Sequence, residues 1–361
     1  MIFQVSPNLD SDELDLLSET ITNAWLTEGP FTEKFLDQIK TRTGAKYALP
    51  VNNGTLGLYL ALIALDLPKH SEIIIPTFTF FGSVSSAHFA GLKPVFVDVS
   101  SDDYMLNASL IEAAITPKTS AIMPVHIYGQ SVDLDPIITL AKKHNLRVIE
   151  DAAQAMGVLY KGKHCGTIGD VGVISFFADK TITMGEGGVV LTNHEDLYNK
   201  LKLVRNQGRP NSGTFIHPEF GMNFRITDMQ AAVGLAQLAK LDDIIEKKTQ
   251  RYSWYEHSLQ DINGITQVKK QPYSSFVPFR YFFTCDLQEE VSMAIEAAGI
   301  QTRRFFYPMH KQPSVLKHYG VQKPLPNSEF LYSSGLCLPV HQNISPLIVD
   351  KITASIKSIY Q

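Results

Sequence analysis

An alternation of short apolar runs with amphipathic stretches constrains the fold of this chain more than any other feature. The apolar runs are rich in β-branched and aromatic residues, and several are apolar throughout, which is typical of strands buried on both faces. They lie at residues 71–78, 93–99, 120–128, 146–151, 171–177 and 187–193. Helical patterns lie at 54–65, 133–145, 194–206 and 226–260. This order of elements predicts an α/β fold.

The last helical pattern is unusually long and carries Gly234 inside it, so we expect either a bend there or a connection between two domains. After it the chain changes in character. A strand at 280–287 and a helix at 289–299 precede a proline-bearing segment that runs to residue 345. We therefore predict a large domain at 1–244 and a smaller C-terminal α+β domain at 245–361.

Composition excludes several classes of protein. With 44% hydrophobic residues, 19% charged residues and a formal net charge of −4, nothing indicates binding to nucleic acid or to an anionic membrane surface. No apolar run is long enough for a membrane span, and the first residues do not resemble a signal peptide. The three cysteines are far apart, and no residues have metal-ligand spacing, so we expect no disulfide framework, no metal and a cytoplasmic location.

Polar groups follow several predicted strands, where functional groups of α/β sheets gather. Asp151 ends one strand, Lys180 follows another, Phe80 follows a third, and Asn53 precedes a helix that begins near Gly54. Taken singly, each has a structural explanation, such as a strand-end cap, a core aromatic or a helix N-cap. Together, a lysine, a carboxylate, an aromatic ring and a helix start are what pyridoxal 5′-phosphate requires.

The segments that carry these groups also show a family resemblance along most of the chain. They include "AWLTEGPFTEKF", "NNGTLGLYLAL", "PTFTFFGSV", "PVHIYGQSVDLDPI", "IEDAAQA", "GDVGVISFFADKTITMGEGGVVLTN", "GMNFRITDMQAAVGLAQL", "RRFFYPMH" and "LCLPVH". In these segments the chain resembles the sugar-aminotransferase branch of the fold type I pyridoxal-phosphate enzymes. The resemblance implies a large domain with a mixed, mostly parallel sheet between helices.

The resemblance also implies roles for individual residues. Lys180 matches the lysine that forms the Schiff base with pyridoxal 5′-phosphate, and its presence excludes the dehydratase relatives, which have histidine there. Asp151 matches the carboxylate that pairs with the ring nitrogen. The other implied cofactor contacts are Gln154 at the ring hydroxyl, Phe80 on the ring face, Gly54, Thr55 and Ser175 at the phosphate, and Asn223 of the neighbouring subunit, also at the phosphate.

The implied protein is a homodimer with shared active sites that aminates a nucleotide-linked keto-sugar, with L-glutamate as donor and 2-oxoglutarate as product. Similar segments occur in enzymes acting at C4 of a GDP-linked 4-keto-6-deoxyhexose, in pathways such as O-antigen biosynthesis. UDP- or dTDP-linked sugars, C3 amination and a pyridoxal-phosphate-binding regulatory protein are the alternatives. We expect substrate contacts at Thr27, Arg225, Tyr307 and His310, and structural roles for His126 and His341.

Overall fold

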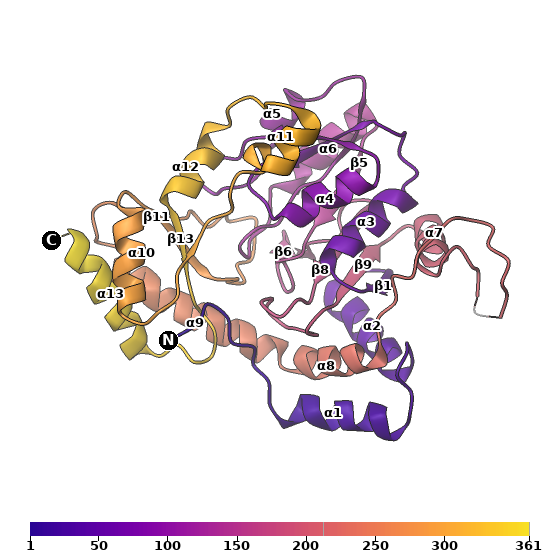
Figure 1. Ribbon diagram of the computed structural model, residues 1–361, viewed down its shortest axis with the longest axis horizontal. Coiled ribbons are helices and arrows are strands. Elements are labelled where there is room, and N and C mark those ends of the chain that lie inside the picture. Colours follow the sequence, from indigo (N-terminus) through magenta and orange to yellow (C-terminus); the bar gives the residue numbers. More distant parts are fainter. Residues whose placement is uncertain (212, 361) are drawn as a thin grey trace.

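A seven-stranded mixed sheet forms the centre of the protein, for which a computed structural model describes residues 1–211 and 213–360 (Figure 1). Its strand order is β1-β9-β8-β5-β4-β2-β3. The strands between β8 and β3 are parallel, whereas β9 is antiparallel to both of its neighbours. The bounds are β1 Tyr47–Val51, β2 Glu72–Pro76, β3 Lys93–Val97, β4 Thr119–Ile122, β5 Arg147–Asp151, β8 Val171–Ser175 and β9 Gly188–Thr192. The predicted α/β fold with a mostly parallel sheet is confirmed.

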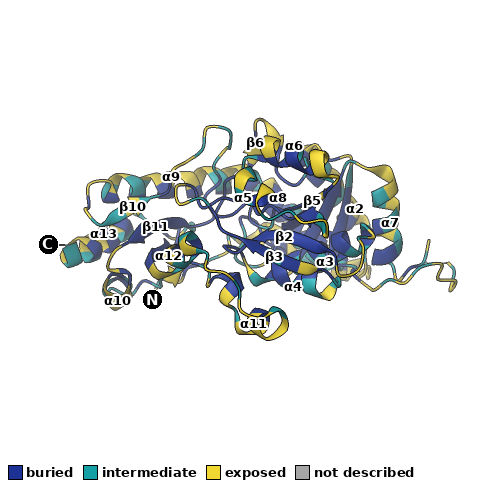
Figure 2. Cartoon of the chain, turned by 90° about the horizontal axis from the view of Figure 1, so that it is seen from above, coloured by how far each residue is buried: buried dark blue, intermediate teal, exposed yellow. Residues whose placement is uncertain are grey.

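Helices cover both faces of this sheet. Successive strand residues alternate between two clusters of apolar side chains: Ile73 and Ile75 face one cluster and Ile74 faces the other. The sheet is therefore covered on both faces, and exposed residues gather on the outer sides of the helices (Figure 2). The first cluster includes residues of α3 (Gly54–Ala64), α4 (Phe81–Phe89) and α7 (Glu195–Arg205); the second includes residues of α2 (Pro30–Thr43), α5 (Ala108–Glu112), α6 (Leu134–His144) and α8 (Asp228–Ala239).

The first strand of the sheet was not predicted from the sequence. In β1, Pro50 interrupts the apolar pattern, and proline cannot donate a ladder hydrogen bond. The strand is tolerated because it lies at an edge of the sheet and pairs with β9 alone. The sequence analysis also did not identify α2 or α1 (Ser11–Thr22), which packs on α8.

A smaller four-stranded antiparallel sheet lies beside the first, in the order β10-β11-β13-β12. Its strands are β10 Ile265–Gln267, β11 Tyr281–Cys285, β12 Arg303–Arg304 and β13 Gly335–Leu338. It is accompanied by α10 (Gln288–Ala297), α12 (Pro326–Ser334) and α13 (Pro346–Tyr360), whereas α11 (Pro313–Tyr319) packs against α4 and β3 of the large sheet. The first residues of the chain join this part, since Ile2 bridges to Ile300. The predicted boundary between 244 and 245 stays a prediction.

The long helical pattern is two helices. α8 ends at Ala239 and α9 runs from Leu241 to Leu259, so the break lies at Lys240 and not at Gly234. A Cβ atom at Gly234 would lie 2.8 Å from the Met184 side chain and 2.9 Å from that of Phe35, so close packing explains this glycine. α9 extends from the large sheet towards the small one (Figure 1). Within the described ranges no helix is long and apolar enough to cross a membrane.

Gly172 in β8 offers a test of how tightly the central sheet is packed. A Cβ atom there would lie 2.2 Å from the carbonyl oxygen of Gly166, and backbone cannot move aside as a flexible side chain can. We expect Gly172→Ala to lower the free energy of unfolding by about 3 kcal/mol or more, measured by urea denaturation. Gly44→Ala is the matched control, because Gly44 has φ +73 but open space around it. This variant should lower the free energy of unfolding by only about 1–2 kcal/mol. Equal losses in the two variants would contradict this account.

Candidate active site

A cavity of about 480 Å³ opens at the carboxyl ends of the parallel strands. Its size suits a cofactor together with part of a substrate. The predicted residues that line it come from four separate stretches of the chain: Gly54, Thr55, Phe80, Asp151, Gln154, Ser175 and Lys180. The fold therefore brings seven of the eight predicted catalytic and cofactor residues to one place.

Asp151 is the last residue of β5 and its carboxylate is held from two sides. Oδ2 accepts a hydrogen bond from the Ser83 hydroxyl at 2.6 Å, and Oδ1 accepts one from the backbone N–H of Ala153 at 3.1 Å. Burial raises the pKa of this carboxyl, and the two hydrogen bonds and the nearby charge of Lys180 oppose that rise only in part. A cationic partner in the cavity would relieve the cost of burying the charge.

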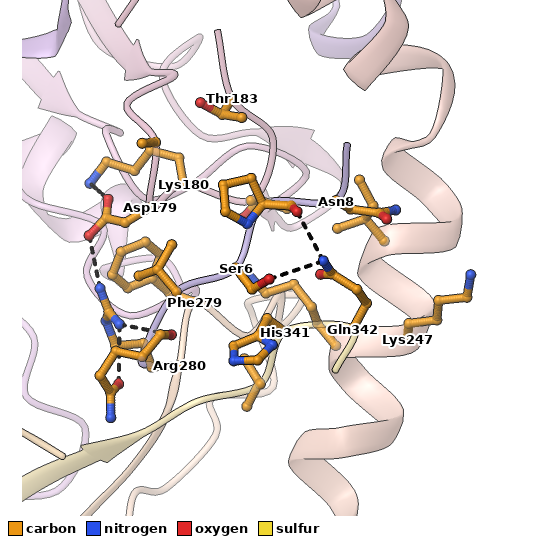
Figure 3. Close-up of a pocket in the computed structure, with 18 of the residues that line it drawn as sticks. Ser6, Asn8, Asp179, Lys180, Thr183, Lys247, Phe279, Arg280, His341 and Gln342 are labelled. Atoms are coloured by element: carbon orange, nitrogen blue, oxygen red, sulfur yellow. Dashed lines mark hydrogen bonds and ion pairs between the residues drawn. The ribbon is translucent and has the colours of Figure 1, made fainter. Parts of the chain in front are cut away.

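Lys180 lies in the connection between β8 and β9, and its backbone N–H donates to the carbonyl of Phe177 at 3.0 Å. Burial lowers the pKa of its amine, and Arg280 lowers it further, against the opposing effects of Asp179 and Asp151. Asp179 is itself engaged by Arg280, with 2.8 Å between the guanidinium and Oδ2 (Figure 3). The amine is therefore closer to its nucleophilic, unprotonated form than an exposed lysine would be.

The start of α3 forms the side of the cavity suited to an anion. Asn53 caps the helix by accepting from the N–H of Leu56 at 2.9 Å, which leaves the N–H groups of Gly54 and Thr55 outside the helical hydrogen-bond pattern. Gly54 is required there because a Cβ atom would lie 2.9 Å from the Cβ of Ser175. These donors, with the Ser175 hydroxyl and the positive end of the helix dipole, would hold a phosphate.

Gln154 and Phe80, two further predicted cofactor contacts, also line the cavity. Gln154 accepts the N–H of Tyr128 on its Oε1 atom at 2.9 Å, so its NH₂ group remains available to a ligand. Phe80 is the N-cap residue of α4 and is 60% exposed, although it follows a buried strand. An exposed ring lining a cavity is suited to stack on a planar ligand.

Asn223, Arg225 and Thr27 do not line this cavity within the described residues. Asn223 is exposed, and its Oδ1 accepts the backbone N–H of Arg225 at 3.1 Å. The guanidinium of Arg225 donates to Asn206 at 2.7 Å, and Thr27 bridges to Thr227. Their predicted roles stay predictions.

Tyr307 and His310 also lie outside the cavity lining. Tyr307 is 40% exposed and packs edge to face on Tyr332. His310 is buried between the hydroxyl of Thr77, at 2.8 Å, and the carboxylate of Glu329, at 3.1 Å. This geometry is that of a structural histidine, and its contact with the sugar stays a prediction.

Several residues that line the cavity were not singled out in the sequence. Ser83 is one: it follows Thr79 by four positions, and their hydroxyls lie 2.8 Å apart where the chain enters α4. That spacing could have indicated a shared hydrogen-bond network. Residues from the C-terminal part of the chain carry no such local signal, because only the tertiary fold places them here: Phe279, Arg280, Arg303, Arg304 and Phe306.

His126 lines the cavity but is already paired. Its Nε2 lies 3.0 Å from the Glu150 carboxylate, which also accepts N–H groups of the turn at Gly166 and Gly169. His341 contacts the carbonyl of Phe3 through Nε2 at 2.9 Å. Both contacts are of the structural kind expected from the sequence.

Comparison with known proteins agrees with this geometry. Residues 7–357 match the model of the DegT/DnrJ/EryC1/StrS aminotransferase family. The chain belongs to this family. It is 37% identical over 365 residues to the GDP-perosamine synthase of Caulobacter vibrioides and 38% identical over 359 residues to that of Escherichia coli O157:H7, covering 98% of this chain and 97% of each relative.

A solved structure resembles the whole chain. DesV of S. venezuelae, solved in complex with a ketimine intermediate, superposes with a TM-score of 0.93 at 28% identity, over 97% of this chain and 95% of that one. The chain with this sequence is therefore an aminotransferase, and its cofactor is pyridoxal 5′-phosphate. The cavity fits that group, since it offers a buried amine, a buried carboxylate and a helix start with free N–H groups.

Asp151 gives a prediction in which stability and activity change in opposite directions. Folding raises the pKa of the Asp151 carboxyl, so the folded chain binds a proton there more readily than the unfolded chain does. The free energy of unfolding therefore falls as the pH rises from the unfolded pKa of this carboxyl to its folded pKa. Asp151→Asn removes the buried charge, so the cofactor-free protein should unfold at an equal or higher temperature at pH 7–8. Transamination should fall about ten- to hundredfold, because a charged hydrogen bond is lost.

Glu150→Gln is the matched control on the same strand. Burial raises the pKa of Glu150, but hydrogen bonds from His126 and from the turn at Gly166 and Gly169 outweigh this and lower it. Its charge therefore stabilises the fold above the unfolded pKa, and the variant should melt at a lower temperature at neutral pH. A lower melting temperature for Asp151→Asn than for Glu150→Gln would show that the Asp151 charge is structural.

Proposed function

We propose that this protein transfers the amino group of L-glutamate to C4 of a nucleotide-linked 4-keto-6-deoxyhexose, and that the substrate is GDP-4-keto-6-deoxymannose, which yields GDP-perosamine. The observation that carries the proposal is the full-length similarity to GDP-perosamine synthases from two organisms, together with the complete set of cofactor groups in one cavity.

The proposed chemistry divides among few residues. The cofactor supplies an electron sink and carries the amino group between two half-reactions. Lys180 Nζ, as a free amine, takes the proton from the donor's α-carbon and returns one to the sugar carbon in the reverse steps. Asp151 holds the proton on the ring nitrogen, because its buried carboxylate gains a cationic partner there. Sharing one site between two partial reactions implies ping-pong kinetics.

The charges around the cavity support anionic substrates. Three arginines of the C-terminal part line it, and Arg303 and Arg304 are exposed on β12. Arg280 is committed to Asp179, whereas Arg304 pairs with Glu289, a carboxylate that is 75% exposed. An exposed ion pair of this kind contributes little free energy, so the Arg304 guanidinium can leave Glu289 for a substrate carboxylate or diphosphate with little loss of stability.

We also propose a homodimer in which Asn223 reaches the cofactor phosphate of the other subunit. Asn223 does not line the cavity of its own chain. It lies in the connection between α7 and α8, which projects from the molecule beside α7 (Figure 1) and carries exposed apolar side chains. These are Phe215, Ile216, Phe220 and Met222. Exposed apolar residues gathered in one segment are typical of a surface that a partner covers. The turn contact of Asn223 with Arg225 is the competing explanation.

The function is tested with GDP-, UDP- and dTDP-linked 4-keto-6-deoxyhexoses and glutamate, with the amino-sugar identified by mass and its amination position by NMR. We expect turnover with the GDP-linked sugar and amination at C4. Lys180→Ala is the control and should lose turnover by several orders of magnitude while it remains folded, since it lies in a loop. Preference for a UDP- or dTDP-linked sugar, or amination at C3, would replace the substrate assignment. Turnover by Lys180→Ala would end the assignment of the base.

Subunit mixing tests the shared site. Lys180→Ala and Asn223→Asp each cripple a homodimer, the second by placing a negative charge at the phosphate. In a mixed dimer with shared sites, one site carries both lesions and the other carries neither, so about a quarter of wild-type activity should return after random exchange. A mixture of Lys180→Ala with Asp151→Asn is the control and should show no recovery, because both residues line the same chain's cavity. No recovery in the first mixture after verified exchange would refute the shared site.

A further inference from the structure

Asp179 directly precedes Lys180 and lines the large cavity, yet the proposed catalytic steps give it no role. It also lines a second, much smaller cavity of about 50 Å³, which lies between the start of the chain and α9 (Figure 3). Its side chain is only 17% exposed, so water screens its charge less than it would screen a charge on the surface. The two oxygen atoms of this carboxylate have different surroundings.

The Oδ2 atom of Asp179 is anchored by the C-terminal part of the chain. It accepts a hydrogen bond from the Arg280 guanidinium at 2.8 Å, and the guanidinium of Arg303 lies 3.8 Å away. Arg280 is itself only 3% exposed, and its other terminal nitrogen donates to the side-chain oxygen of Gln4 at 3.2 Å. Groups from outside its own loop therefore hold the Asp179 carboxylate in one orientation.

The Oδ1 atom of Asp179 faces Lys180. It lies 3.6 Å from the Nζ atom of Lys180, and within the residues that the structure describes no hydrogen bond engages this buried oxygen. The same Nζ atom lies 4.9 Å from the ring centroid of Phe279, so part of the surroundings of the amine is apolar. A buried oxygen without a hydrogen-bond partner is costly, and a protonated Lys180 amine would relieve that cost.

Two other carboxylates line the large cavity, and neither replaces Asp179. The proposed chemistry assigns Asp151 to the ring nitrogen of the cofactor. Glu186 is exposed, and in the described part of the chain its carboxylate forms no ion pair with Lys180. Asp179 is therefore the carboxylate that remains to balance a proton on Lys180.

The rest of the surroundings disfavours that proton. Burial lowers the pKa of the Lys180 amine, and the charge of Arg280 lowers it further. Lys248 of α9 lines the smaller cavity, but burial lowers its own pKa to about 7, so it is mostly uncharged above that pH. Lys247 is paired with the exposed carboxylate of Asp243 at 2.7 Å.

We propose that Asp179 is a positioning residue whose Oδ1 atom holds the Lys180 amine in its protonated form after the amine has taken the proton from the α-carbon of the amino donor. The inference rests on the proposed role of Lys180 as the reacting base. In that step the proton moves from carbon to Nζ, and the electron pair of the C–H bond is left to the electron sink that the cofactor supplies. Lys180 thereby becomes an ammonium group beside Asp179, and Arg280 keeps the carboxylate in place.

The protonation equilibrium of Lys180 agrees with this arrangement. A general base is most effective when its pKa lies near the working pH, so an amine that burial weakens too far would bind the proton poorly. The charge of Asp179 is the largest of the effects that raise the pKa of Lys180 against burial. Asp179 therefore offsets part of the desolvation and leaves the amine able both to accept and to release a proton.

The test measures the protonation of Lys180 in the cofactor-free protein. Trace acetylation with acetic anhydride is followed across pH by mass spectrometry of the peptide that contains Lys180, in the unaltered protein and in Asp179→Asn. The half-labelling pH should fall in the variant, because the balancing charge is gone. At a fixed pH below the half-labelling point, the reactive fraction of Lys180 should therefore rise about three- to tenfold.

Asp243→Asn is the matched control. It makes the same chemical change at an exposed carboxylate, whose partner Lys247 lines the smaller cavity, so the titration of Lys180 should not move. Circular dichroism establishes that each variant is folded and gives its melting temperature. A purely structural role of Asp179 would lower the melting temperature and leave the half-labelling pH of Lys180 unchanged.

An unchanged or higher half-labelling pH in folded Asp179→Asn would overturn the proposal, and so would an equal fall in Asp243→Asn. If Asp179→Asn does not fold, the decision rests on the double variant Asp179→Asn/Arg280→Gln, which removes both members of the buried ion pair. The half-labelling pH should still fall there, because Asp179 acts on Lys180 more strongly than Arg280 does, and an unchanged or higher value would overturn the proposal. Neither cofactor nor sugar is used, so failure of the substrate panel and failure of this inference are separate outcomes.

Discussion

The site depends on the close approach of three backbone segments at Gly54, Ser175 and Gly188. A Cβ atom at Gly54 would lie 2.9 Å from the Cβ of Ser175, and one at Gly188 would lie 2.9 Å from the carbonyl carbon of Asn53. Any larger side chain would push α3 off the ends of β8 and β9. Because the helix start sits directly on these strand ends, its free N–H groups and the lysine connection share one cavity.

Burial of charge is the second constraint, and the protein meets it in different ways at adjacent positions. Glu150 receives a histidine and N–H groups of a turn, and its pKa is lowered. Asp151, one residue along the same strand, receives two hydrogen bonds but forms no ion pair in the described part of the chain, and burial raises its pKa despite the nearby charge of Lys180. The first carboxylate is satisfied by the fold, whereas the second is left for a ligand to satisfy. That difference agrees with the proposed role of Asp151 as the carboxylate at the cofactor.

The C-terminal part of the chain supplies the outer side of the site. Arg280 precedes β11 and reaches across to Asp179, while Arg303 and Arg304 belong to β12. The small antiparallel sheet therefore carries positive charge to the mouth of a cavity whose cofactor groups come from the large sheet. This division places the proposed reacting groups on rigid strand ends and the groups for recognising anions on a separate element.

The sequence by itself determined most strands of the large sheet and the polar residues that follow them. Six strands of the large sheet were predicted from apolar runs because strands buried on both faces need no polar residues, and Asp151, Lys180 and Gly54 were singled out because strand ends and helix starts are local features. Only the tertiary structure decided which distant residues meet them. Ser83, Phe279 and Arg280 line the cavity because the fold brings together segments far apart in the chain, and β1 was hidden by Pro50, which only an edge position tolerates. Periodicity reports what one segment buries, whereas packing between segments decides what it is buried against.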